Sequence, residues 1–175
     1  MTSRRQFIKK SILATAATGF SVKSYGKILG ANDRVRVACV GFSDRHRASH
    51  VGPFKELMKE MNFEMVGLSD IWNKRREEGK AFLDKQLGAD VKVYRNNEEL
   101  YASKSVDAVM MSTADFQHAL HTIEAVKAGC DVYAEKPLAE TMADNRAVLK
   151  AVKDSGKIVQ IGSQRRSGPN YHAAE

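Results

Sequence analysis

The stretch Val35-Arg36-Val37-Ala38-Cys39-Val40-Gly41, residues 35–41, is a short β-branched run that ends at a glycine. It is the first of six predicted strands, and the others span residues 63–69, 91–94, 106–112, 131–134 and 158–161. One helix is expected between the first two strands, and apolar residues at helical spacing predict further helices over 71–88, 117–129 and 140–155. Because such alternation implies right-handed crossovers, the sequence predicts an α/β fold, a doubly wound and mostly parallel sheet.

Glycines and cysteines fit this pattern. Gly88, Gly129 and Gly156 stand where the helical patterns stop, as glycine does just after a helix C-terminus. The two cysteines, Cys39 and Cys130, lie in apolar stretches, so we expect buried thiols and no disulfide framework.

Most of the positive charge lies near the N-terminus. Of the formal net charge of +7, residues 1–33 carry +5 and residues 34–175 carry +2. The near-neutral body shows no basic stripe interleaved with aromatic residues, so nucleic-acid binding is not expected.

Residues 1–30 are expected to be an export signal. Arg4-Arg5-Gln6-Phe7-Ile8-Lys9 precedes a weakly apolar run, 11–22, and resembles a twin-arginine signal; an ordinary secretory signal or a frayed basic N-terminus is the alternative. The run is shorter than the roughly 20 residues that cross a bilayer, so no stable membrane anchor is expected. We therefore expect export to the periplasm by the twin-arginine pathway, which carries proteins already folded.

Residues that follow the first two strands are candidates for dinucleotide binding, because the carboxyl ends of parallel strands carry the ligand site. The first strand is followed by Gly41-Phe42-Ser43-Asp44-Arg45-His46, in which Ser43 and His46 replace two glycines of the fingerprint G-x-G-x-x-G. The loop therefore also fits a plain strand-to-helix turn. His46 is expected to push the helix away from the strand. Asp70 follows the second strand and would accept hydrogen bonds from the ribose of NAD, which favours NAD over NADP. Lys74 and Arg75 would soften that preference.

The fourth and fifth strands also end in polar residues. Hydroxyls and backbone in the stretch 112–118 are expected to line the cofactor, and the pair His118 and His121 has no third ligand at metal-site spacing, so no metal is expected. In Glu135-Lys136-Pro137 the proline aims Lys136 from the sheet edge, and its peptide bond is a candidate cis bond. A lysine beside a nicotinamide ring hydrogen-bonds the hydroxyl being oxidised and helps to move its proton.

In order and spacing, residues 31–37, Asp70, Ser112-Thr113-x-Asp115, Glu135-Lys136-Pro137 and 162–166 resemble the glucose-fructose oxidoreductase / inositol dehydrogenase / MocA family. The resemblance implies an NAD-binding Rossmann domain over residues 31–166 and oxidation of a sugar or cyclitol hydroxyl by hydride transfer. It assigns the proton-handling role to Lys136 and the ribose to Asp70. The other cofactor-binding residues that it implies are Gly41, Ser43 and Arg45 near the pyrophosphate, Ser112, Thr113, His118 and Glu135 along the cofactor, and Gln164 and Arg165 near the nicotinamide end.

The resemblance also implies a C-terminal α/β domain that holds the substrate and is missing here. Residues 167–175 are expected to begin the connection to it, so we interpret the sequence as a fragment of a homo-oligomeric enzyme, itself without turnover on a sugar. A non-catalytic dinucleotide-binding module and an NAD-recycling glycoside hydrolase of the same family are the alternatives.

Overall fold

The computed structural model describes residues 34–166 and 169–173. The chain divides into two units, Met1–Arg34 and Val35–Glu175, and the second carries the fold. The predicted export signal lies outside the described residues. In the part of the chain that is described, no helix has the length and apolar character needed to cross a membrane.

Six strands form one parallel sheet in the order β3-β2-β1-β4-β5-β6. Their bounds are β1 Val35–Val40, β2 Phe63–Ser69, β3 Lys92–Tyr94, β4 Ala108–Met111, β5 Asp131–Glu135 and β6 Val159–Gly162. This is the doubly wound order. The strand order reverses between β1 and β4, because the connections that leave these two strands run to opposite sides, and a crevice opens there at the carboxyl ends of the strands. The predicted fold class is confirmed.

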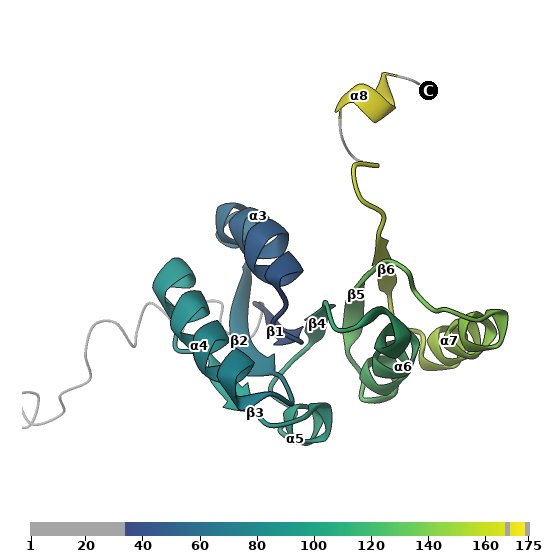
Figure 1. Cartoon of the computed structure of the whole chain (residues 1–175), viewed down its shortest axis with the longest axis horizontal. Coiled ribbons are helices and arrows are strands. Elements are labelled where there is room, and N and C mark those ends of the chain that lie inside the picture. The colour runs from purple at the N-terminus through teal and green to yellow at the C-terminus, as the bar shows by residue number, and fades with distance from the viewer. Residues whose placement is uncertain (1–33, 167–168, 174–175) are drawn as a thin grey trace, which may run out of the picture. The chain divides into compact units, whose positions relative to one another are not determined.

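Helices cover both faces of the sheet, α3 and α4 on one face and α5, α6 and α7 on the other (Figure 1). The described helices are the π-helix η1 His46–His50, α3 Val51–Leu57, α4 Asn73–Leu87, α5 Asn97–Ala102, the 3₁₀ turn η2 Asp115–Gln117, α6 His118–Lys127, α7 Met142–Ser155 and α8 Pro169–His172. The three long helices lie where the periodicity predicts them, with ends shifted by one or two residues. The short helix α5 was not predicted.

The core is split between the two faces because successive strand residues point to opposite sides. In β1, Val37 and Cys39 pack in the cluster beneath α3 and α4, whereas Ala38 and Val40 pack with α5, α6 and α7. Both cysteines are buried free thiols, as predicted.

Three helices end at the predicted glycines. Gly88 and Gly156 adopt left-handed conformations at the C-caps of α4 and α7, with φ of 63° and 66°, and Gly129 follows α6 with φ of 91°. These stops fix where the chain leaves each helix and turns toward the next strand.

Candidate cofactor and catalytic site

A cleft of about 890 Å³ lies at the carboxyl ends of β1, β2 and β4. Its volume falls in the usual range for small-molecule sites, roughly 300–1,000 Å³. The loops after the three strands supply most of its wall. Six of the predicted cofactor-binding residues line it: Gly41, Ser43, Arg45, Asp70, Ser112 and Thr113.

Gly41 lets the loops after β1 and β4 approach closely. Its φ is +79°, and a Cβ at this position would lie only 2.6 Å from Cγ2 of Thr113. Its N–H donates to the carbonyl of Ser69 at 2.8 Å, which ties the loop to β2. A side chain at residue 41 would both strain the backbone and collide with the loop after β4.

Ser43 and Ser112 join the first helix, which begins at residue 44 and continues through η1 and α3, to the end of β4. The Ser43 hydroxyl donates to Oγ of Ser112 at 3.1 Å and accepts the His46 N–H at 3.3 Å. Ser112 in turn donates to the carbonyl of Gly41 at 3.3 Å. The helix therefore starts at the cleft, where its first N–H groups favour an anion such as a pyrophosphate.

Asp70 braces the cleft from β2. One carboxylate oxygen accepts the Phe42 N–H at 2.9 Å, and the other accepts the Trp72 N–H at 2.8 Å. A carboxylate has about four lone-pair positions, so each oxygen keeps the capacity to accept a ribose hydroxyl. The geometry is compatible with the predicted ribose role.

A smaller cavity of about 240 Å³ adjoins the cleft through shared walls that include Ser43 and Thr113. Lys136, Glu135, His118 and Gln164 line it. The Lys136–Pro137 peptide is cis, as the sequence suggested. Within the described residues, the exposed Lys136 ammonium has no hydrogen-bond or ion-pair partner.

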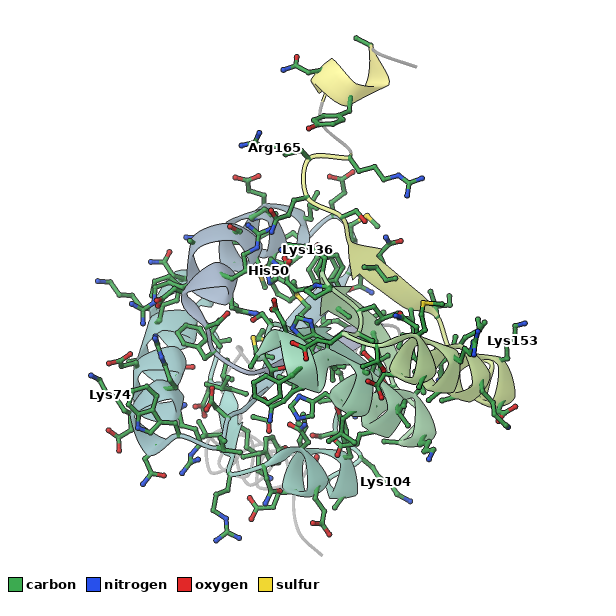
Figure 2. The ribbon with its side chains drawn as sticks, turned by 45° about the vertical axis from the view of Figure 1, so that its right-hand side comes forward. His50, Lys74, Lys104, Lys136, Lys153 and Arg165 are labelled. Atoms are coloured by element: carbon green, nitrogen blue, oxygen red, sulfur yellow. The ribbon has the colours of Figure 1, made fainter. Side chains whose placement is uncertain are left out.

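Figure 2 places Lys136 next to His50 at one end of the fold, whereas Lys74, Lys104 and Lys153 lie around its other edges. Lys136 directly follows β5 and lines the smaller cavity, whereas the other three lysines line neither cavity.

Glu135 is a buried carboxylate held by two donors. Its Oε1 accepts from Nε of Arg45 at 2.9 Å and from Nε2 of His50 at 2.7 Å, and its side chain is only 5% exposed. Burial alone would raise the pKa of Glu135, but the hydrogen bonds from Arg45 and His50 outweigh burial and hold that pKa below its usual range. Glu135 is therefore ionised near neutral pH.

Behind Glu135, a chain of buried polar groups runs to β1. Nδ1 of His50 lies 3.4 Å from Nδ1 of His46, and Nε2 of His46 lies 2.6 Å from Sγ of Cys39. Burial lowers the pKa of His46 to about 3, and burial also lowers the pKa of His50. With both rings neutral, one tautomer set fits these three contacts: Cys39 donates to His46, His46 to His50, and His50 to Glu135.

The hydrogen-bonded series from Cys39 to Glu135 depends on a wide helical turn. Residues 46–50 form a π-turn in which the Val51 N–H donates to the carbonyl of His46, and Pro53 just beyond it has no N–H to donate. His46 is fully buried against Cys39 in this turn. A bulky residue at the third fingerprint position is thus accommodated by local helix geometry, and sequence reasoning missed the role of His50.

His118 ties two site loops together. Its ring is buried, with Nδ1 2.7 Å from the carbonyl of Pro137 and Nε2 3.1 Å from the carbonyl of Thr113. Both ring nitrogens therefore face backbone acceptors, although the residue lines the smaller cavity. Of the two predicted residues after β6, Gln164 lines that cavity, whereas Arg165 stands in an exposed turn outside both cavities with φ of +67°.

Comparison with known proteins identifies the family. Residues 35–163 match the profile of GFO_IDH_MocA, described as an oxidoreductase family with an NAD-binding Rossmann fold. The chain belongs to this family. The resemblance seen in the sequence is confirmed, and the domain is an NAD-binding Rossmann domain of an oxidoreductase. Among the described residues, no group of three or more His, Cys, Asp or Glu side chains is placed to hold a metal ion.

The relatives include enzymes named for cyclitols. The chain is 36% identical over 109 residues to inositol 2-dehydrogenase of Salmonella typhimurium, covering 62% of this chain and 31% of the relative. It is 34% identical over 87 residues to inositol 2-dehydrogenase/D-chiro-inositol 3-dehydrogenase of Halalkalibacterium halodurans, covering 49% of this chain and 25% of the relative.

Among solved structures, myo-inositol 2-dehydrogenase of Lactobacillus plantarum has a similar fold, with a TM-score of 0.69 and 22% identity over 81% of this chain and 40% of that one. In these matches the chain spans a quarter to two fifths of the length of its relatives.

Proposed function

We propose that this chain is the cofactor-binding part of an NAD-dependent enzyme that oxidises a hydroxyl of a sugar or cyclitol. The observation that carries the proposal is the placement of Lys136, whose ammonium has no partner among the described residues, in a small cavity adjoining the NAD cleft. The names of the inositol dehydrogenase relatives support a polyhydroxylated ring as substrate.

The residues of the cleft fit NAD. Gly41 leaves room where a Cβ would collide with Thr113, and Ser43 places a hydroxyl at the start of the first helix. Asp70 keeps lone pairs for the ribose hydroxyls while its other lone pairs fix the loops. The N–H groups at the start of the first helix would hold the pyrophosphate, and Asp70 would hold the ribose.

When bound, the nicotinamide would accept the hydride from the substrate carbon. Nζ of Lys136 would donate a hydrogen bond to the oxygen on that carbon and stabilise the negative charge that develops there as a base outside this chain takes the hydroxyl proton. The ionised carboxylate of Glu135, anchored by Arg45 and His50, would keep the preceding strand end rigid. The proposal also includes substrate-binding residues that lie outside this chain, because the relatives are several times longer than their matched segments.

The experiment uses the protein translated from the complete reading frame that contains this chain. NADH formation at 340 nm is measured with a panel of cyclitols and sugars, in the wild type and in Lys136→Met. Lys153→Met, an exposed lysine at the end of α7, is the matched control. We expect Lys136→Met to lose turnover by several orders of magnitude while NAD still binds, and Lys153→Met to keep it.

Two results would contradict the proposal. Turnover that survives in Lys136→Met would remove the catalytic role of that lysine. NAD binding without turnover on any compound of the panel would favour a non-catalytic dinucleotide-binding module.

We also propose that the full protein is exported by the twin-arginine pathway and forms homo-oligomers. The arginine pair Arg4-Arg5 before Gln6-Phe7 supports the export step. Replacing both arginines by lysine should retain the protein in the cytoplasm, measured by cell fractionation, whereas unchanged export would contradict this pathway. Light scattering of the full protein tests the oligomer.

A further inference from the structure

Arg75 and Asp44 face each other at the mouth of the NAD cleft. Nη1 of Arg75, on α4, lies 3.0 Å from Oδ1 of Asp44, at the start of the first helix. The guanidinium also lies over the ring of Trp72, 5.8 Å from its centroid. All three side chains line the cleft, as does the ribose-binding candidate Asp70.

Both guanidinium groups of the cleft are paired with carboxylates. Arg45 is engaged by Glu135 and Arg75 by Asp44, and a second carboxylate, Glu78, lies 3.7 Å from Arg75. The lining also includes three further carboxylates, from Asp70, Glu98 on α5 and Glu124 on α6. Both arginines that line the cleft are therefore already paired, and the nearby ammonium of Lys74, over the ring of Trp72, lies 3.9 Å from Glu78.

A nearby arginine is the usual means by which a Rossmann site accommodates the 2′-phosphate of NADP, whereas an acidic residue after the second strand favours NAD. Arg75 stands five residues after Asp70, on the helix that begins beside the ribose site, so it is placed for the first role. Asp44, on the facing wall of the cleft, pairs with the Arg75 guanidinium and neutralises its charge. A 2′-phosphate would meet the carboxylates of Asp44 and Asp70 and an arginine that is already paired.

We propose that Asp44 is a specificity-determining residue that excludes NADP by neutralising Arg75. The proposal rests on the proposed function, because it concerns the cofactor of that same site. Asp44 acts on the choice between the two cofactors, and the fold does not depend on it, since its side chain is 80% exposed and surface ion pairs contribute little to stability.

The test is isothermal titration of NAD and of NADP into the 175-residue chain. The variants are Asp44→Asn, Arg75→Gln and the double variant. Asp90→Asn removes one carboxylate from an exposed ion pair with Lys80 outside the cleft, and it serves as the control. We expect Asp44→Asn to lower the ratio of the NADP to the NAD dissociation constant about tenfold. That gain should vanish in the double variant and be absent in Asp90→Asn.

The outcomes separate this inference from the proposed function. If the wild type binds NAD but the ratio does not move in Asp44→Asn, or moves equally in Asp90→Asn, the role of Asp44 is refuted and NAD binding stands. A gain that persists without Arg75 would also overturn it. If neither cofactor binds any variant, NAD binding by the chain fails and this inference fails with it.

Discussion

Acidification from pH 7 to pH 5 is expected to destabilise the fold through His46. Burial lowers the pKa of His46 to about 3, against an ordinary value of 6.5 in the unfolded chain. Between these values the unfolded state binds the proton and the folded state does not, so the free energy of unfolding falls as the pH falls. The stability is complete above pH 6.5 and is lost progressively toward pH 3.

The magnitude follows from linkage. At pH 5 an unfolded histidine of pKa 6.5 is almost fully protonated, whereas His46 in the folded state is neutral, which gives a loss of about 2 kcal/mol relative to pH 7. The result barely changes if the folded pKa lies anywhere below about 4. His50 adds to the loss in the same direction, because burial lowers its pKa too.

Urea unfolding followed by circular dichroism at pH 7 and pH 5 measures the effect. In His46→Gln, the loss between the two pH values should be smaller than in the wild type by about 2 kcal/mol. His121→Gln should also reduce the loss, because burial lowers the pKa of His121 and its contribution has the same sign. The same pH dependence in His46→Gln and the wild type would refute the reasoning.

If His46→Gln does not fold, the histidine resonances of the wild type give a second measurement. The His46 ring signals should not titrate between pH 7 and pH 5. A midpoint near 6.5 would show that the ring is not held neutral by burial.

Two further predictions concern stability, each measured by urea unfolding. Gly41→Ala should lower the free energy of unfolding by more than the roughly 1 kcal/mol that a strained left-handed residue costs, because its Cβ also meets Thr113. Gly88→Ala has open space around its Cβ and should lose only the cost of that strain. Equal losses in the two variants would contradict the close approach of the loops at Gly41. Glu135→Gln should destabilise by about 1–3 kcal/mol, because Arg45 and His50 lose a charged acceptor, and an unchanged midpoint would contradict the anchoring role.

The strands and long helices were predictable because their signals are local. Alternating β-branched runs and terminal glycines identify β1 to β6 and the ends of α4 and α7 from neighbouring residues alone. The helix α5 has only six residues, too few for a clear period, although Asn96 accepts the Glu99 N–H at 2.8 Å as an N-cap does. An asparagine three residues before a glutamate, as in Asn96 and Glu99, was therefore the sequence signal that could have predicted α5.

The candidate site was predictable only where it follows strand ends. Asp70 and Lys136 each stand just after a strand, so their placement at the same edge of the sheet follows from parallel topology. The hydrogen bond between His50 and Glu135 joins residues 85 positions apart and depends on a π-turn, so no local sequence pattern predicts it. Arg165 failed to join the site residues because the chain turns after β6.

The most direct test of the central claim, that NAD binds in the cleft at the carboxyl ends of β1, β2 and β4, is fluorescence titration. Trp72 is the only tryptophan of the chain, and it is half exposed in the wall of the cleft beside Asp70. NAD should change its emission saturably in the 175-residue chain, with one site per chain. Asp70→Asn should weaken binding about tenfold, whereas Asp154→Asn, an exposed carboxylate on α7, should not. No saturable change in the wild type, or equal affinity in Asp70→Asn, would contradict the account.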